Sequence, residues 1–100
     1  MKLAALLILL APLFEDATEP CGLAGVQGDR FSFADLDADG DDDLIVGGRR
    51  LFLNEKGRFV ERPDALPQAK GSSAACADFN GDGRLDILTL GGTLFIQTQK

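Results

Sequence analysis

Two acidic stretches of this chain share one spacing of oxygen-bearing side chains. The first, "DLDADGDDD", covers residues 35–43 and contains six aspartates in nine positions, and the second, "DFNGDGRLD", covers residues 78–86. Both follow the pattern D-x-[DN]-x-D-G-x-x-D. Carboxylates this close together repel one another. A folded chain therefore tolerates them only if they spread into water or converge on a cation.

The spacing favours a cation that prefers hard oxygen ligands. Side chains at positions 1, 3, 5 and 9 can point to a common centre as the chain curls, and the glycine at position 6 permits the sharp turn. Position 7 can contribute its main-chain carbonyl. Neither loop contains His or Cys, so we expect Ca²⁺, with about two ions per chain. The candidate ligands are Asp35, Asp37, Asp39, Asp41 and Asp43 in the first loop, and Asp78, Asn80, Asp82, Arg84 and Asp86 in the second.

Two other interpretations of the loops can be weighed on the residues themselves. An EF-hand needs a bidentate Glu at position 12 between two helices, but Val46 and Thr89 stand there, inside apolar runs. A solvated acidic turn explains one such loop well. It does not explain why both copies keep oxygen-bearing side chains at positions 1, 3, 5 and 9 while position 8 changes from Asp42 to Leu85.

The two loops belong to a longer internal repeat. A shift of 43 residues places Asp35 on Asp78 and Gly48 on Gly91, and it aligns apolar residues on both sides of the loops. Each unit consists of short strand-like runs separated by turns, which predicts strands over 30–35, 43–48, 50–54 and 58–62, and then over 72–78, 85–92 and 93–99. Four short strands in about 40 to 45 residues are typical of a propeller blade. The predicted fold class is therefore all-β, with propeller-type blades of four short antiparallel strands, one full and one incomplete.

Composition restricts the function further. The chain has 100 residues and a net charge of −6, which does not suit a nucleic-acid partner. It contains no His, which excludes Ser-His-Asp triads and imidazole metal sites. The aspartates with regular spacing are already assigned to the two loops, so no separate carboxylate pair is left for glycoside hydrolysis. We therefore predict no catalytic residues and no enzyme activity.

The N-terminus is typical of an export signal. Lys2 precedes an apolar run over residues 3–14, which is too short to span a bilayer but suits the hydrophobic part of a signal peptide. A buried N-terminal helix or strand is the alternative. We predict a signal peptide or leader over 1–20, a linker over 21–27, a first repeat over 28–65 and an incomplete second repeat over 66–100. Cys21 and Cys76 either pair, as export would permit, or remain free thiols.

The acidic loop, the apolar strand after it, the Gly-Gly turn and "LFLN" together resemble the FG-GAP/VCBS repeat family over about residues 28–99. The phenylalanine and Gly-Ala-Pro signature that names the family is not present as such, and "VGG" and "LGG" stand near its place. The resemblance implies β-propeller blades like those of integrin α-subunit heads and of many secreted bacterial proteins. It also implies one calcium ion in each acidic loop, bound by the ten residues named above.

The sequence thus predicts a secreted, periplasmic or cell-surface module in which calcium has a structural role. Its partner would be a protein or a carbohydrate, and the alternative is a non-catalytic propeller fragment of a larger exported enzyme. Repeat units bury their apolar faces against neighbouring units, so at least three units are usually needed for stability. We therefore expect further blades, either from a longer chain or through self-association.

Overall fold

A computed structural model of the chain describes residues 12–67, 69 and 71–98. Within these ranges the backbone forms strands and turns and contains no helix. None of the described residues therefore forms a helix with the length and apolar character needed to cross a membrane. The strands are β1 (Phe31–Ala34), β2 (Asp43–Val46), β3 (Arg50–Glu55), β4 (Arg58–Glu61), β5 (Ala74–Ala77), β6 (Asp86–Thr89) and β7 (Leu94–Phe95).

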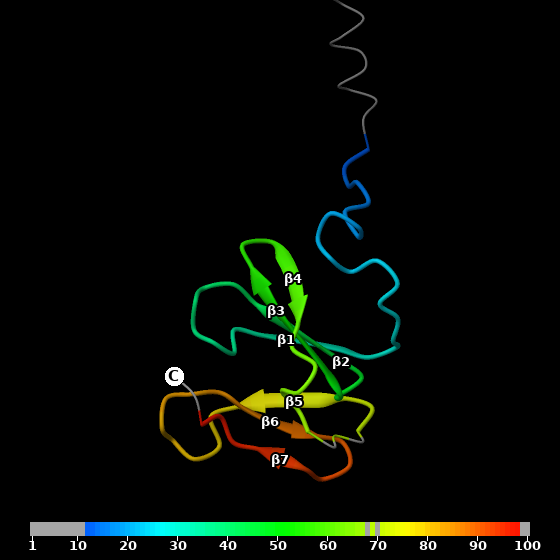
Figure 1. The fold of residues 1–100 in the computed structure, drawn as a ribbon. Coiled ribbons are helices and arrows are strands. Elements are labelled where there is room, and N and C mark those ends of the chain that lie inside the picture. The colour runs from blue at the N-terminus through cyan, green and yellow to red at the C-terminus, as the bar shows by residue number, and fades with distance from the viewer. Residues whose placement is uncertain (1–11, 68, 70, 99–100) are drawn as a thin grey trace, which may run out of the picture.

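The strands form two antiparallel sheets, one from each repeat. The first sheet has the order β1-β2-β3-β4 and the second has the order β5-β6-β7, so every strand pairs with its neighbour in the chain (Figure 1). This arrangement confirms the predicted all-β class with one four-stranded blade and one incomplete blade. The connection that starts at Pro63 leads from the first sheet to the second, as its proline-rich sequence predicts.

The register of each sheet divides its side chains into two faces. In the first sheet, Ser32 pairs with Ile45, and Ile45 pairs with Leu51. Because directly paired residues project to the same side of a sheet, these three side chains share one face, which we call the Ile45 face. Leu44 pairs with Phe33 and with Phe52 on the opposite face, which we call the Phe33 face.

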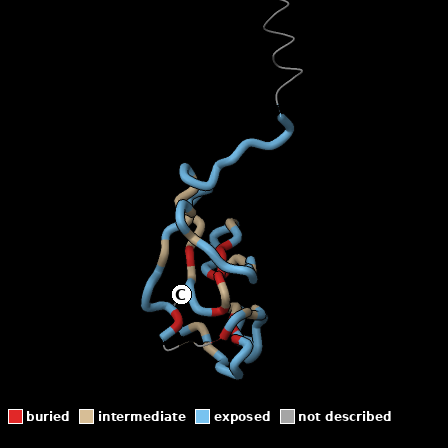
Figure 2. The backbone as a smooth tube through the Cα atoms, turned by 90° about the vertical axis from the view of Figure 1, so that its right-hand side faces the viewer, coloured by how far each residue is buried: buried red, intermediate tan, exposed pale blue. Residues whose placement is uncertain are grey.

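The main core lies between the two sheets. Ile45 of the first sheet and Ile87 of the second are both buried, and Leu36 and Leu66 complete this cluster. The side view in Figure 2 shows the buried positions within the body of the molecule, away from the exposed N-terminal stretch. A direct polar contact supplements the apolar packing, because the Ser32 hydroxyl donates to the carbonyl oxygen of Ala74 at 2.7 Å. The two repeats therefore form one packed unit.

The segment over 21–27, which we predicted to be a linker, packs on the Phe33 face of the first sheet. Leu23 and Val26 contact a second buried cluster that contains Leu44, Val46 and Phe52. The main-chain N–H of Phe59 in β4 donates to the carbonyl oxygen of Cys21 at 2.8 Å. In Figure 1 this segment runs beside the first sheet. The apolar residues at 23 and 26 thus give the segment a structural role that we did not predict.

The predicted leader is described only in part. Residues 1–11 lie outside the described residues, and residues 12–20 are exposed, with Leu13 at 90 % and Phe14 at 84 % of their surface accessible. Cys21 and Cys76 are both free thiols, so of the two alternatives the structure has the unpaired one. Cys76 lies in β5 against the main core, and burial raises the pKa of its thiol.

Candidate metal centre

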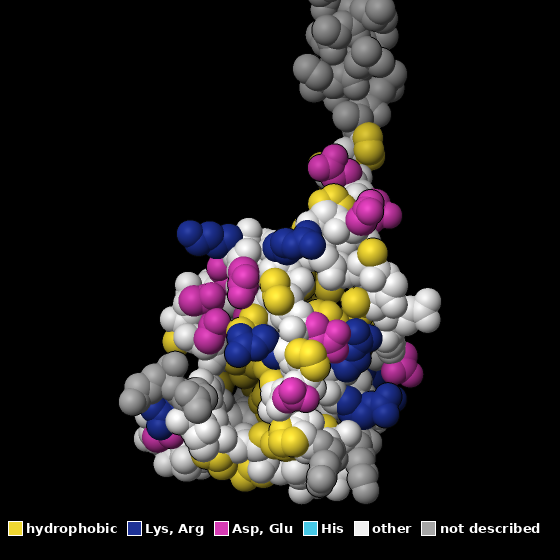
Figure 3. All heavy atoms as spheres, in the orientation of Figure 1, with side chains coloured by type: hydrophobic (Ala, Val, Ile, Leu, Met, Phe, Trp, Pro, Cys, Tyr) yellow, Lys and Arg dark blue, Asp and Glu magenta, His cyan; other side chains and the backbone are white. Residues whose placement is uncertain are grey.

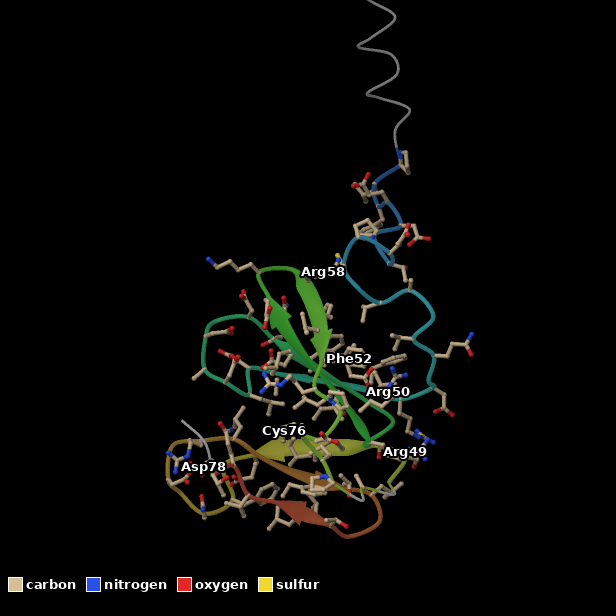
Figure 4. The ribbon with its side chains drawn as sticks, in the orientation of Figure 1. Arg49, Arg50, Phe52, Arg58, Cys76 and Asp78 are labelled. Carbon is tan, nitrogen blue, oxygen red and sulfur yellow. The ribbon has the colours of Figure 1, made fainter. Side chains whose placement is uncertain are left out.

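The two acidic loops occupy equivalent places in the two sheets. The first connects β1 to β2, and the second connects β5 to β6. In Figure 4 Asp78 lies at the end of β5, and Arg49 and Arg50 lie at the opposite end of the sheets. Asp and Glu side chains gather over the β1–β2 loop in the space-filling view (Figure 3). The loops thus form an acidic end of the molecule.

Main-chain N–H groups shape the first loop around the side chain of Asp35. Asp39 donates to Asp35 Oδ1 at 3.1 Å, and Gly40 donates to Asp35 Oδ2 at 2.8 Å. Farther along, the N–H of Asp41 donates to Asp39 Oδ1 at 2.9 Å. These bonds curl the chain so that one carboxylate oxygen from each of Asp35, Asp37 and Asp39 lies within 4.8 Å of the others. The alternate spacing seen in the sequence therefore does bring positions 1, 3 and 5 together.

The second loop repeats this hydrogen-bond framework. Asp82 and Gly83 donate to the two oxygens of Asp78 at 3.1 and 2.7 Å, and Arg84 donates to Asp82 Oδ1 at 2.9 Å. The backbone conformation is also repeated, since Ala38 and its equivalent Gly81 both have positive φ values, of 59° and 75°. Two loops of different composition thus adopt one geometry.

The aspartate at position 9 closes each loop from inside the sheet. Asp43 and Asp86 are buried, at 0 % and 1 % exposure. Asp43 accepts from the N–H of Leu36 and the N–H of Asn54, both at 2.8 Å. Asp86 accepts from the equivalent groups, the N–H of Phe79 at 2.9 Å and the N–H of Gln97 at 2.8 Å. A carboxylate oxygen has more than one lone pair, so these bonds leave acceptor capacity for a cation.

Two residues of these loop supports were not predicted from the sequence. The side-chain amide of Asn54 donates to the carbonyl oxygen of Asp42 at 3.0 Å, and that of Gln97 donates to the carbonyl oxygen of Leu85 at 2.7 Å. Asn54 and Gln97 are separated by the repeat shift of 43 residues. A search of the repeat for paired amide side chains would have identified them, although only the fold shows that they support the acidic loops.

The charges of the first loop act on one another. Partial removal from water, together with the nearby charges of Asp43 and Asp39, raises the pKa of Asp37 to about 6. Burial also raises the pKa of Asp43. The N–H of Asp41 lowers the pKa of Asp39 by stabilising its ionised form. Removal from water is thus the main cause of both raised pKa values, and the neighbouring carboxylates add to it.

The second loop carries its own positive charge. The guanidinium of Arg84 lies 3.3 Å from Asp82 Oδ2. The N–H of Arg84 and this charge together lower the pKa of Asp82. Position 3 is also the neutral Asn80 instead of an aspartate. The second loop therefore accumulates less negative charge than the first.

The predicted ligands differ in their surroundings: some lie together in the exposed loops, and others are buried beneath them. The structure brings together the carboxylates of Asp35, Asp37 and Asp39, and it places Asp78, Asn80 and Asp82 at the equivalent positions of the second loop. Asp43 and Asp86 lie beneath the loops and bind the main chain. Whether the predicted ligands hold a metal stays a prediction at all ten positions.

The fold and the loops together define a class of protein: an all-β repeat protein whose blades each carry one acidic loop between their first two strands. Comparison with known families matches residues 35–89 to the FG-GAP-like repeat. The match covers more than half of the chain, which therefore belongs to the FG-GAP-like repeat family. This repeat is a structural module that is typically not catalytic. Comparison with curated proteins gives no match, and comparison with solved structures gives none.

Proposed function

We propose that this chain is a calcium-stabilised repeat module, with one structural Ca²⁺ in each acidic loop. The convergence of Asp35, Asp37 and Asp39 within 4.8 Å of one another carries the proposal. The donors are all hard oxygens, which suit Ca²⁺ better than Zn²⁺ or Cu²⁺. Removal from water and the charges of Asp43 and Asp39 raise the pKa of Asp37, and a bound ion would offset the repulsion between these carboxylates.

The two sites are expected to differ in affinity. The first loop has six aspartates in nine residues, whereas the second has a neutral residue at position 3 and an internal ion pair between Arg84 and Asp82. Calcium affinity in such loops rises with the number of ligand charges. The first loop therefore binds the ion more tightly. Typical extracellular calcium modules have dissociation constants of about 10⁻⁴ to 10⁻³ M.

Isothermal titration calorimetry of Ca²⁺ into the full chain, in buffer stripped of metal, tests this proposal. We expect saturable binding of about two ions at millimolar calcium. Asp39→Asn should remove the tighter site, because it takes away a charge at position 5 of the first loop. Asp64→Asn is the matched control, because Asp64 is exposed in the connection after the first sheet. Absence of binding at millimolar calcium, or equal binding by both variants and the parent, would refute the proposal.

We further propose that the chain is exported and presents its repeats to a protein or carbohydrate outside the cytoplasm. The apolar run over 3–14 supports export, as does the exposure of Leu13 and Phe14, which take no part in the described core. Mass spectrometry of the protein recovered from the cell exterior tests the proposed export. The expected product starts near residue 20. Retention of the whole protein in the cytoplasm would refute export.

A groove between the repeats offers a place for such a ligand. It has a volume of about 490 Å³ and an apolar floor that includes Leu51, Ile87 and Phe95. Asp37, Arg62 and Gln97 add polar groups at its wall. Because Asp37 also belongs to the first loop, ligand binding in this groove should depend on calcium. Arrays of glycans and of extracellular proteins, probed with labelled chain in calcium and in chelator, test this. Binding that is the same in both would contradict it.

The alternative role, a non-catalytic part of a larger exported enzyme, shares the calcium sites and predicts no glycan or protein binding.

A further inference from the structure

The two acidic loops carry opposite charges at one equivalent position. Position 7 is Asp41 in the first loop and Arg84 in the second. In each loop the main-chain N–H at this position donates to the aspartate at position 5, at 2.9 Å in both cases. The loop framework therefore forms with either side chain at position 7. What the side chain at this position changes is the charge of the loop.

The side chain of Arg84 turns back over its own loop. Its guanidinium lies 3.3 Å from Oδ2 of Asp82, and the other oxygen of the same carboxylate accepts from the Arg84 N–H. The two side chains are 38 % and 28 % exposed, so the pair lies at the surface but is partly withdrawn from water. Arg84 therefore supplies positive charge to a carboxylate that the proposed Ca²⁺ would use.

The first loop has no such counter-charge. Within the described part of the chain, no lysine or arginine forms an ion pair with an aspartate of this loop. Its nine residues include six aspartates and no basic residue, whereas the second loop has three aspartates and one arginine. Like charges at this spacing repel one another unless a cation lies between them. Without calcium, the repulsion in the first loop is therefore unrelieved, and the repulsion in the second is partly balanced from within.

The ion pair of Arg84 is incomplete. Its Nε is shielded from water and has no hydrogen-bond partner among the described residues. An N–H donor that is shielded in this way and left unpaired costs free energy. The ion pair between Arg50 and Glu61 is better made, because two parallel hydrogen bonds of 2.9 Å join its members. Release of the Arg84 guanidinium would return its Nε–H to water, so a competing cation displaces this side chain at little cost.

We propose that Arg84 is an exchangeable counter-cation of the second loop, which pairs with Asp82 in the calcium-free chain and leaves it when Ca²⁺ binds. The main-chain carbonyl at position 7 stays in place, so only the side chain moves. Arg84 thus stabilises the empty loop and weakens its affinity for calcium. The exchange step rests on the proposed calcium function, whereas the role of Arg84 in the empty loop does not.

Calorimetry of the full chain tests the competition with Ca²⁺. All variants here also carry Asp39→Asn, which is expected to disable the first site and leave the second. Arg84→Gln keeps the main-chain carbonyl and removes the charge, so it should tighten calcium binding by at least about threefold at low ionic strength. Arg49→Gln is the matched control, because Arg49 is exposed at the opposite end of the sheets (Figure 4). Unchanged affinity in Arg84→Gln, or an equal gain in the control, would overturn the proposal.

Urea denaturation in metal-free buffer tests the empty loop separately. Arg84→Gln should lower the urea midpoint more than Arg49→Gln does, because only Arg84 balances a loop carboxylate. The reciprocal change, Asp41→Arg, places a positive charge at position 7 of the first loop and should raise the midpoint. An Arg84→Gln chain as stable as the Arg49→Gln chain, or an Asp41→Arg chain less stable than the parent, would contradict the role of Arg84 as a counter-cation.

Nuclear magnetic resonance observes the exchange itself. The Nε–H signal of Arg84, assigned by its loss in Arg84→Gln, should exchange with water faster after the second loop is saturated with Ca²⁺. An unchanged exchange rate at saturation would show that the side chain stays in place, which overturns the exchange. A parent chain that binds no Ca²⁺ would instead refute the proposed calcium function. Calcium binding together with unchanged urea midpoints would overturn the counter-cation alone.

Discussion

The side-chain amide of Gln97 donates a hydrogen bond to the carbonyl oxygen of Leu36 at 2.9 Å, although 61 residues separate the two in sequence. Leu36 lies in the first acidic loop, where its N–H donates to Asp43. Gln97 also supports the second loop, through Asp86 and Leu85. Gln97, which follows β7, thus connects the two candidate calcium loops. We therefore expect that the loops influence each other.

Shortening this side chain should uncouple the loops. Gln97→Asn is expected to keep the bond to the carbonyl oxygen of Leu85, as Asn54 does with Asp42, and to lose the bond to Leu36. One lost hydrogen bond of this kind costs about 0.5 to 1.5 kcal/mol of the free energy of unfolding. Urea denaturation with and without calcium measures this, and calorimetry should show weaker binding at the first site. Thr98→Ala, at an exposed neighbouring position, serves as control; an equal effect there would argue against the link.

The buried and exposed aspartates of one loop should respond differently to the same substitution. Asp43→Asn places an amide NH₂ where two main-chain N–H groups need acceptors, and it should cost about 1 to 3 kcal/mol of stability even without calcium. Asp39→Asn should leave calcium-free stability nearly unchanged, because Asp39 is exposed and its remaining oxygen can still accept from Asp41. Chemical denaturation in metal-free buffer checks the difference. Equal losses in the two variants would mean that Asp43 does not close the loop as described.

Without calcium, the chain should be more stable near pH 5 than near pH 7. The pKa of Asp37 is raised from 3.8 to about 6 in the folded state, so between these values the folded chain binds a proton that the unfolded chain has released. The contribution of Asp37 to stability is therefore present at low pH and is lost as pH rises through about 6. Asp43, whose pKa is also raised, acts in the same direction.

Urea midpoints at the two pH values, measured in metal-free buffer and in millimolar calcium, test this dependence. Calcium should reverse it, because the ion competes with the proton for the same carboxylates. Asp37→Asn should flatten the calcium-free dependence. A calcium-free chain that gains stability steadily from pH 5 to pH 7 would show that other groups dominate.

Gly48 should be the glycine least tolerant of substitution at the contact between repeats. Its φ is +71°, and an added Cβ would meet the main chain of Ser73 at 2.4 Å. Gly48→Ala should therefore cost about 2 kcal/mol or more of the free energy of unfolding. Gly91→Ala, at the equivalent position of the second repeat, should have little effect, because among the described residues its Cβ would approach only the N of Gly71, at 4.0 Å. Thermal unfolding of both variants at low concentration checks the pair; similar shifts would contradict this account of the inter-repeat contact.

Much of the fold could be predicted from residue order. The apolar run of Leu44, Ile45 and Val46 directly after an acidic loop indicated a buried strand, and the glycines at 40 and 83 marked the turns. The 43-residue register predicted both blades, because side-chain alternation and turn chemistry are local properties that the sequence displays directly. The common spacing of Asp35, Asp37 and Asp39 predicted their convergence for the same reason.

Other features depended on contacts between distant parts of the chain. The sequence marked Asp43 as a ligand, but only the fold showed that it is buried and bonded to Leu36 and Asn54. No local sequence pattern predicts that Leu23 and Val26 pack on the first sheet. None predicts that Gln97 donates a hydrogen bond to the other repeat. Spacing along the chain determines which side chains lie on one strand or in one turn. Which residues bury these side chains or form hydrogen bonds with them depends on how one sheet packs on the other. Only the tertiary structure decides this.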